Sequence, residues 1–339
     1  MPGRRREWPD LRYVSPMRAV RCHELTGPAA LRVDEIDAPV AGEGQVVVDV
    51  RAAGVNFPDV LITAGKYQFA PTPPFVPGGE IAGVVREVGE GVTGIAVGDR
   101  VAATMLFGAF AEQVCVPASN VFALPDAVPF DVGAAVLVAY ATTMHALIDR
   151  AKLRAGETLL VLGAAGGVGL AAIELGKCLG ARVIAAASSE AKLALCRSRG
   201  ADETIDYGRE DLRARLKVLA QKGVDVVYDP VGGDFTELAV RSLAWEGRLL
   251  VVGFTTGTIP KIPTNLLLLK NCQVMGVFWG AFTQREPDRN RAHVDQLLQW
   301  IAEGRVRPHI DAALPLDRAA EALGRLERRE AQGKLVLVP

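Results

Sequence analysis

The hydrophobic pattern of this 339-residue chain changes character near residue 130. Before that point, short runs of alternating or β-branched residues are separated by Gly, Pro and acidic turn residues, a pattern typical of strands. The runs are RAVRCHEL, GQVVVDVRAAGV, GGEIAGVVREVG, GDRVAA and FAEQVCVP. Several strands at this spacing predict a small, partly closed barrel.

After residue 130, an apolar, alanine-rich stretch over 131–151 predicts a helix, and strands then alternate with helices. The predicted strands are TLLVLG, RVIAAA, ETIDY, VDVVYD, RLLVVG and QVMGVF, and the helices between them span 167–179, 189–199, 209–221, 234–243 and 263–270. This alternation predicts a parallel, doubly wound sheet. The tail from residue 289 has two amphipathic helices and a final strand, and we expect it to return to the first domain.

Length and pattern together predict an α/β protein of two domains. A first domain over 17–135 is completed by 281–339, and a dinucleotide-binding domain spans 136–280. Residues 1–16 contain four arginines but no apolar core of a secretion signal. We expect them to be a disordered extension or the product of an upstream start codon, with a short organelle-targeting peptide as the alternative.

Composition argues against several classes of function. The formal net charge of −1 gives no electrostatic reason for a nucleic-acid or membrane-surface partner. No apolar run reaches the ~20 residues that a membrane span needs. The five cysteines form no CxxC pair, which argues against a disulfide framework or a cysteine-rich zinc site. We therefore expect the protein in the reducing cytoplasm.

A glycine-rich turn over 163–169, GAAGGVG, follows the strand TLLVLG. Gly166 would let the backbone approach a pyrophosphate, and Gly169 would permit close packing of helix on strand. Because Ala164 replaces the first glycine of the usual motif, the evidence for a nucleotide site is the whole strand–turn–helix–strand unit over 158–187; the alternative is an ordinary tight turn. The helix start directs its amide N–H groups at an anion, so we expect contacts from Ala165, Gly166, Gly167 and Val168.

The end of the second strand of this unit favours NADPH over NADH. NAD sites usually place an acid there, about 20 residues after the turn, to bond the ribose 2′-hydroxyl. Here the strand ends Ala187-Ser188-Ser189, and the first acid is Glu190. A 2′-phosphate would meet two hydroxyl groups and Lys192, although Lys192 could equally be a solvated helix lysine.

The order of these parts resembles the medium-chain dehydrogenase/reductase superfamily from Met17 onward. The motifs that carry the resemblance are AAGVNFPDVLITAGKY, PGGEIAGVVREVGEGV, VGDRV, AAGGVG, GADETIDY and GKLVLVP. Within the superfamily, VNFPD, AAGGVG, ETIDY and KNCQVMGVFWG are similar to the zinc-independent NADPH:quinone oxidoreductases, the zeta-crystallin-like branch. The resemblance implies a GroES-like barrel domain, a Rossmann domain, and a homodimer that pairs the sixth strands.

The zinc-dependent alcohol dehydrogenases of this superfamily carry a catalytic cysteine, a histidine and a further cysteine as metal ligands. The matching positions here are Asn56, Gly79 and Val138, and Glu80 matches the glutamate that follows the histidine. The positions of the proton relay hold Pro58 and Leu61. Since Asn, Gly and Val cannot replace thiolate and imidazole, the resemblance implies no catalytic zinc.

Without a Lewis acid, hydride transfer from NADPH is easiest to an acceptor that is already electrophilic, so we expect a quinone. The alternatives are reduction of the C=C bond of an enone, 2-alkenal or enoyl thioester, and, from another class, a non-catalytic NADPH-binding protein. Asn56 could orient the cofactor or the acceptor carbonyl, or be a turn asparagine bonded to its own backbone. Tyr67 matches a tyrosine that donates to substrate in related enoyl reductases, or it lines a pocket.

The remaining cofactor contacts are expected where strands end, because ligands collect at the carboxyl edge of a parallel sheet. There we place Tyr207, Gly253, Phe254, Phe278 and Trp279, of which the aromatic residues could equally be packing residues. The resemblance adds Lys334 in the terminal motif. The arginines near the end of the chain fit a solvated helix face: Arg325, Arg328 and Arg329.

Overall fold

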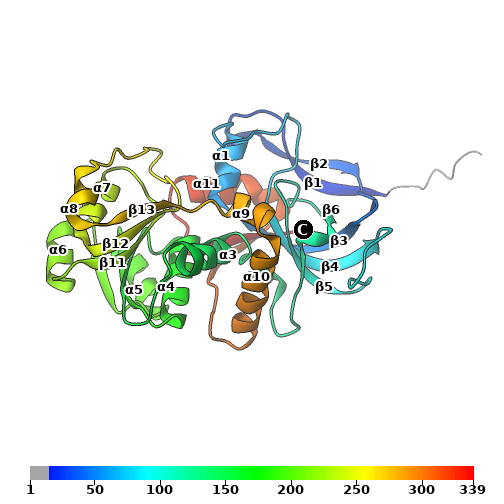
Figure 1. The fold of residues 1–339 in the computed structure, drawn as a ribbon. Coiled ribbons are helices and arrows are strands. Elements are labelled where there is room, and N and C mark those ends of the chain that lie inside the picture. The colour runs from blue at the N-terminus through cyan, green and yellow to red at the C-terminus, as the bar shows by residue number, and fades with distance from the viewer. Residues whose placement is uncertain (1–14) are drawn as a thin grey trace, which may run out of the picture.

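The structure is a computed structural model that describes residues 15–339 (Figure 1). The predicted extension over 1–16 lies almost wholly outside the described residues, but Pro16 is wrongly included in it, because strand β1 (Pro16–Cys22) begins there. The remaining chain forms an antiparallel-rich β domain and a parallel sheet flanked by helices, so the predicted α/β class is confirmed.

The β domain is built on a seven-stranded sheet of order β14-β15-β3-β4-β5-β7, with β6 paired to β3. A separate antiparallel pair joins β1 to β2. The first-domain strands are β2 (Leu31–Asp37), β3 (Gln45–Val55), β4 (Glu80–Val88), β5 (Arg100–Thr104), β6 (Gln113–Pro117) and β7 (Val121–Ala123). Strands β2 and β7 were not predicted, since β2 buries no residue fully and β7 has only three residues. The helix α1 (Phe57–Thr63) was also not predicted.

The second sheet is six-stranded and parallel, in the order β10-β9-β8-β11-β12-β13. Its strands are β8 (Thr158–Leu162), β9 (Arg182–Ala187), β10 (Glu203–Asp206), β11 (Val224–Asp229), β12 (Leu243–Val251) and β13 (Gln273–Gly276). Alternate residues of β8 enter two cores: Leu159 packs in the core that contains Leu170, and Leu160 in the core that contains Val240. Helices therefore cover both faces, as a doubly wound sheet requires (Figure 1).

The helices between these strands are α4 (Gly167–Cys178), α5 (Glu190–Ser198), α6 (Leu212–Leu219), α7 (Asp234–Ser242) and α8 (Asn265–Lys270). Helix α6 starts three residues later than predicted, because the Asp211 carboxylate accepts from the Ala214 N–H at 2.6 Å and caps it there. The predicted helix over 131–151 is broken into α2 (Phe130–Gly133), α3 (Ala139–Met144) and a π-helical turn (His145–Arg150). It breaks because the Val138 N–H donates to the Glu80 carboxylate at 2.8 Å.

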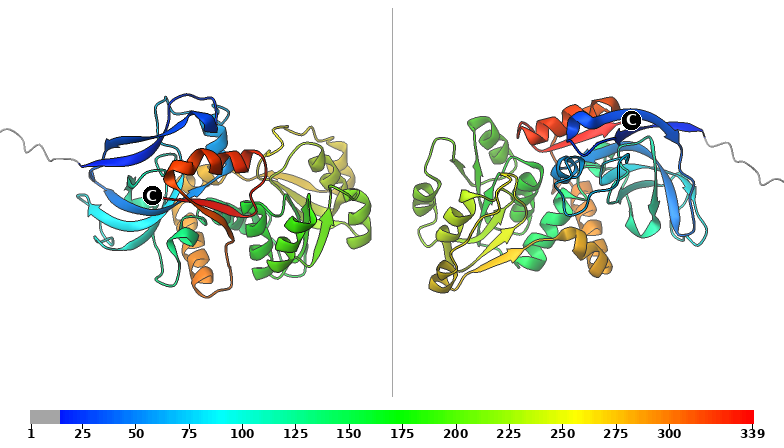
Figure 2. Two further views of the ribbon diagram at one scale, coloured as in Figure 1. Left: turned by 180° about the vertical axis from the view of Figure 1, so that it is seen from behind. Right: turned by 90° about the horizontal axis from the view of Figure 1, so that it is seen from above.

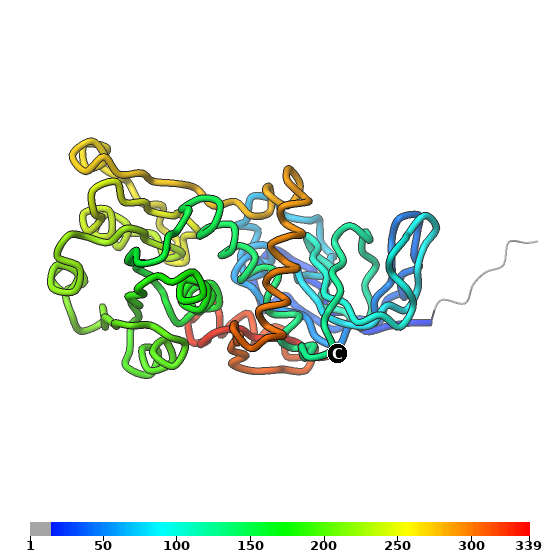
Figure 3. The backbone as a smooth tube through the Cα atoms, turned by 60° about the horizontal axis from the view of Figure 1, so that its bottom comes forward, coloured from blue at the N-terminus to red at the C-terminus, as the bar shows by residue number. Residues whose placement is uncertain are grey.

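The tail returns to the first domain as predicted (Figure 2). After α9 (Trp279–Arg285) and α10 (Pro287–Ala302) come β14 (Ile310–Pro315), α11 (Ala319–Glu327) and β15 (Lys334–Val338), which pairs antiparallel with β3. Figure 3 shows α10 between the two halves of the molecule, where its Val294 shares a core with Phe122 of β7 and Leu159 of β8. This core is continuous across the two halves and does not mark a boundary between them. The domain boundaries at 135 and 280 therefore remain predictions. No helix within residues 15–339 is long and apolar enough to cross a bilayer.

Candidate active site

The glycine turn has the geometry that its sequence requires. Gly163 has a φ of 57°, and a Cβ on Gly169 would lie 2.5 Å from the Gly163 carbonyl oxygen, so a side chain there would force strand and helix apart. A Cβ on Gly166 would meet only that same oxygen, at 3.5 Å, so the backbone at Gly166 is open. Gly166 is also the N-cap residue of α4, and the free N–H groups of the first turn follow it.

The terminal strand β15 lies directly against this turn. The Gly333 N–H donates to the Ala165 carbonyl at 2.8 Å. A Cβ on Gly167 would lie 2.9 Å from Cδ of Lys334, so the lysine stem fills the space that this glycine leaves. The glycine turn and the terminal motif are therefore one structural unit. The contact of Lys334 with a cofactor remains a prediction.

The ammonium group of Lys334 is buried and fully hydrogen-bonded within the first domain. Its side chain is 4% exposed, and Nζ donates to the Val55 carbonyl at 3.0 Å, to Oδ1 of Asn56 at 2.6 Å and to Oε1 of Glu80 at 2.8 Å. The Asn56 amide in turn donates from Nδ2 to the same Glu80 oxygen at 2.8 Å. We call Lys334, Glu80 and Asn56 the lysine triad.

The lysine triad includes Asn56 and contacts Val138, two of the positions that match the zinc ligands of zinc-dependent relatives. Glu80 is completely buried, and its second oxygen accepts the N–H of Val138, so the matched positions lie together in space. These residues do not fit zinc, because they offer no thiolate or imidazole and an ammonium ion already binds the carboxylate. No cluster of three or more metal-ligating side chains was found among residues 15–339.

Asn56 is held by the triad rather than by its own turn. Neither predicted alternative, a ligand-orienting amide or a turn asparagine bonded to its own backbone, included contacts with Lys334 and Glu80. These are the shortest contacts of the Asn56 side chain, whereas its bond to the Gly54 carbonyl is 3.5 Å long. The Asn56 backbone N–H donates to Oδ2 of Asp59 at 2.8 Å, which fixes the start of α1. Asn56 is thus oriented at both its backbone and its amide.

Asp59 was missed by the sequence analysis, although an acid three residues after an N-cap asparagine is a recognisable capping pattern. It is 3% exposed, and burial raises the pKa of its carboxyl to about 7. Tyr67 is partly buried, and burial, with the nearby charge of Asp59, raises the pKa of its phenol. The Tyr67 hydroxyl has no hydrogen-bond partner in the described part of the chain, and its ring meets Phe69 edge-on at 5.4 Å.

At the end of β9, the residues predicted to bind a 2′-phosphate come together. Ser188 is exposed, and Lys192 reaches its hydroxyl at 3.5 Å. Burial raises the pKa of the Tyr207 phenol. The Ser188 hydroxyl, through a hydrogen bond, and the positive charge of Arg329 partly oppose this rise. Ser189 stands beside this group as the N-cap residue of α5.

Arg329 lies beside this group, and its side chain is exposed, as its assignment to a solvated face predicted. It follows α11 with a φ of 58°, its carbonyl accepts from Lys192 at 2.9 Å, and its guanidinium donates to the Thr255 carbonyl at 3.2 Å. The neighbouring Arg325 is also not free, because it pairs with Asp311 at 2.7 Å. No local pattern marks Arg329, since it meets Lys192 from 137 positions away.

The other predicted cofactor residues lie along the carboxyl edge of the sheet. Phe254 follows Gly253 at the end of β12 and is 37% exposed, while Phe278 follows β13 and is 60% exposed. Trp279 differs, because its indole N–H donates to the Asn290 side chain at 3.0 Å and packs it against α10. The Trp279 ring is therefore a packing residue, which was the alternative given for it. Its backbone is the part that could contact a ligand.

Comparison with known proteins gives relatives that span both halves of the chain. Residues 42–126 match the family described as alcohol dehydrogenase GroES-like domain, and residues 167–303 the family described as zinc-binding dehydrogenase. The quinone oxidoreductase-like protein 2 homolog of Nematostella vectensis is 39% identical over 98% of this chain and 91% of its own length. A probable oxidoreductase from Mycobacterium abscessus superposes with a TM-score of 0.87 at 41% identity, over 96% of this chain and 99% of the other. The Escherichia coli quinone oxidoreductase in complex with NADPH gives 0.89 at 31% identity, over 95% and 100%.

Proposed function

This chain belongs to the zinc-independent quinone oxidoreductase branch of the medium-chain dehydrogenase/reductase family, and we propose that it transfers a hydride from NADPH to a quinone. The observation that carries the proposal is the lysine triad, which involves positions that match the zinc ligands of zinc-dependent relatives. A quinone is electrophilic enough to accept hydride without a metal ion, provided that donor and acceptor are aligned. An alcohol or a simple ketone lacks that property.

The nucleotide would be held at two places. The open N–H groups at the start of α4, beside Ala165, Gly166, Gly167 and Val168, suit a pyrophosphate. Ser188, Ser189, Lys192, Tyr207 and Arg329 suit a 2′-phosphate, because they offer hydroxyl groups and positive charge and no carboxylate stands at the end of β9. Bound there, NADPH supplies the hydride. Gly253, Phe254, Phe278, the Trp279 backbone and the Lys334 stem would line the rest of its path.

We assign Asn56 the role of orienting the acceptor or the cofactor amide, with Lys334 and Glu80 fixing it. If the amide acts in the transition state, Asn56→Ala lowers kcat more than it lowers NADPH affinity. Steady-state kinetics and NADPH titration of the same preparation separate the two effects. A variant with the binding and turnover of the parent protein would remove Asn56 from the site.

Tyr67 favours a second candidate function, reduction of the C=C bond of an enone, 2-alkenal or enoyl thioester. Its hydroxyl has no partner among residues 15–339 and a raised pKa, so it stays protonated and available to donate. NADPH oxidation measured across 1,4-quinones, 2-alkenals and enoyl thioesters distinguishes the two functions. Quinone turnover that survives Tyr67→Phe supports the first function, and turnover of alkenes alone that this variant abolishes supports the second.

The same panel tests the alternative of a non-catalytic NADPH-binding protein. That alternative requires micromolar NADPH binding with no turnover of any acceptor. The parent protein, titrated with NADPH before the panel is run, shows whether a negative panel reflects an inactive preparation or a binding protein. Turnover of a single quinone is enough to reject the alternative of a non-catalytic NADPH-binding protein.

We further propose a homodimer through the free edge of the parallel sheet, and a reducing compartment such as the cytoplasm. Strand β13 is at that edge, and Leu268 and Leu269 of the adjacent α8 are 81% and 69% exposed. Covering such residues favours association. All five cysteines are free, which suits a reducing compartment. Sedimentation of the parent protein and of a Leu268→Glu variant tests the dimer.

A further inference from the structure

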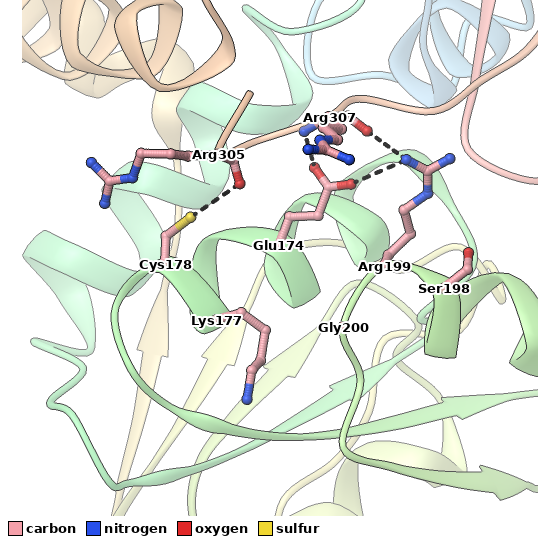
Figure 4. Close-up of a pocket in the computed structure, with 8 residues that line it drawn as sticks. All are labelled: Glu174, Lys177, Cys178, Ser198, Arg199, Gly200, Arg305 and Arg307. Carbon is pink, nitrogen blue, oxygen red and sulfur yellow. Dashed lines mark hydrogen bonds and ion pairs between the residues drawn. The ribbon is translucent and has the colours of Figure 1, made fainter. Parts of the chain in front are cut away.

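A cavity of about 610 Å³ lies at the end of α4 opposite the glycine turn (Figure 4). Its walls come from the last turns of α4, the residues that end α5, and the segment between α10 and β14. Because Glu174, the first residue of α4 that lines the cavity, is seven residues after Gly167, a rise of about 1.5 Å per residue places the cavity at least about 10 Å from the nucleotide turn. It is therefore distinct from the candidate active site.

The cavity is lined by more cations than anions. Its charged residues are Lys177, Arg199, Arg305 and Arg307, with Glu174 as the carboxylate. Lys177 is already neutralised by Asp202, to which Nζ donates at 2.8 and 2.9 Å, and in Figure 4 it points away from the arginines. The arginines are therefore the groups whose charge needs to be explained.

Glu174 cannot balance the three arginines. It is 6% exposed, and one of its oxygens already accepts from the Tyr140 hydroxyl and from the Arg307 backbone N–H, each at 3.1 Å. Its other oxygen lies 3.8 Å from the guanidinium of Arg199 (Figure 4). Burial raises the pKa of this carboxyl, which its hydrogen bonds and the nearby arginine charges partly oppose.

The arginines keep hydrogen-bond donors that nothing in the described chain uses. Arg199 is held by the Arg307 carbonyl at 2.8 Å and contacts Nδ1 of His309 at 3.1 Å, and its buried Nε has no partner among residues 15–339. Arg307 donates from Nε to Gly304 at 2.9 Å, and over the same range no acceptor binds its two terminal nitrogens. Arg305 differs from them, because it forms an ion pair with Glu303 at 3.7 Å and its guanidinium lies over the Trp300 ring at 4.8 Å.

We propose that this cavity binds a small polyanion that carries two or more phosphate or carboxylate groups. Guanidinium groups present paired N–H donors that match the oxygens of both anions. This site would be additional to the one that holds the nucleotide.

Calorimetric titration of the full-length protein saturated with NADPH tests the proposal, because the nucleotide site is then filled. The probes are pyrophosphate in one arm and citrate in the other, which separates phosphate from carboxylate ligands. We expect one saturable site per chain for at least one probe. Binding to neither probe, or binding that NADPH abolishes, would overturn the proposal.

Variants locate the site. Arg305 and Arg307 are exposed, so Arg305→Gln/Arg307→Gln should fold, and we expect it to lower the affinity at least tenfold, whereas Arg307→Lys should keep part of it. The control is Arg51→Gln/Arg86→Gln, which removes the same two charges from exposed positions on β3 and β4. An equal loss in the control, or full affinity in the double variant, would show that the anion binds elsewhere. Thermal unfolding of each variant checks that it is folded.

Discussion

The two ends of the candidate active site handle charge in opposite ways. In the lysine triad, Lys334, Glu80 and Asn56 bind one another, and the ammonium has three partners inside the protein. At the end of β9, Ser188 and its neighbours lie near solvent and leave donors open. Under the proposed function, the two ends would have different roles: the closed end would fix the reacting geometry before any ligand arrives, and the open end would select the nucleotide.

Breaking the closed end should have the largest effect. Lys334→Met keeps the packing of the stem but leaves the buried Glu80 carboxylate without its cation, so we expect a loss of about 3–5 kcal/mol in the free energy of unfolding. Urea denaturation measures it. The double variant Lys334→Met/Glu80→Gln should be more stable than Lys334→Met alone, because it leaves no unpaired charge. Losses that simply add would contradict a coupled pair.

At the open end, a new charge should reverse the selection. Ala187→Asp places a carboxylate where the 2′-phosphate is expected, and we expect NADPH affinity to fall about 100-fold, ~2.7 kcal/mol, while NADH affinity holds or improves. Fluorescence titration with both cofactors measures the ratio. Ala187→Asn, of the same size and without charge, is the control. An unchanged preference would mean that the end of β9 does not face the 2′ position.

The closed end should also respond to pH through Asp59. In the unfolded chain this carboxyl loses its proton near pH 4, whereas in the folded protein its pKa is about 7. Between these values the folded state binds more protons, so raising the pH lowers stability. Relative to Asp59→Asn, the parent protein should lose about 2 kcal/mol between pH 5 and about pH 6.5. Parallel unfolding curves at both pH values would refute the shift.

The smallest effect should come from removing one cation at the open end. Arg329 is exposed and, in the proposed site, would share the phosphate with Lys192 and two hydroxyl groups, so Arg329→Gln should raise KM for NADPH only about five-fold, ~1 kcal/mol. KM for NADH should not change. Arg328→Gln is the matched control, because that arginine pairs with Glu330 instead. A similar rise for both cofactors would mean that Arg329 acts on the fold.

The sequence predicted the parts of the site that are local in the chain. The glycine turn and the end of β9 carry their geometry within a few residues, because the need for glycine at 169 and the lack of an acid after Ala187 are visible without a partner. Resemblance brought Asn56, Glu80 and Val138 together, but it did not predict that an ammonium would join them.

The parts that the sequence could not predict depend on contacts between distant segments. Lys334 meets Glu80 from 254 positions away, and Arg329 meets Lys192 from 137. A single lysine or arginine carries no mark of its partner, and most such residues are solvated. The prediction of one continuous helix over 131–151 was wrong for the same reason, because the carboxylate that accepts the Val138 N–H comes from β4.

Metal-free hydride transfer to a quinone is tested most simply by measuring quinone-dependent oxidation of NADPH by the parent protein before and after treatment with a metal chelator. Because the lysine triad involves positions that match the zinc ligands of zinc-dependent relatives, we predict that turnover of 1,4-naphthoquinone is unchanged by chelation and not raised by added zinc, and that NADPH is used in preference to NADH. Activity that is lost with the chelator and restored by zinc would contradict the account, as would the absence of any quinone turnover by protein that binds NADPH.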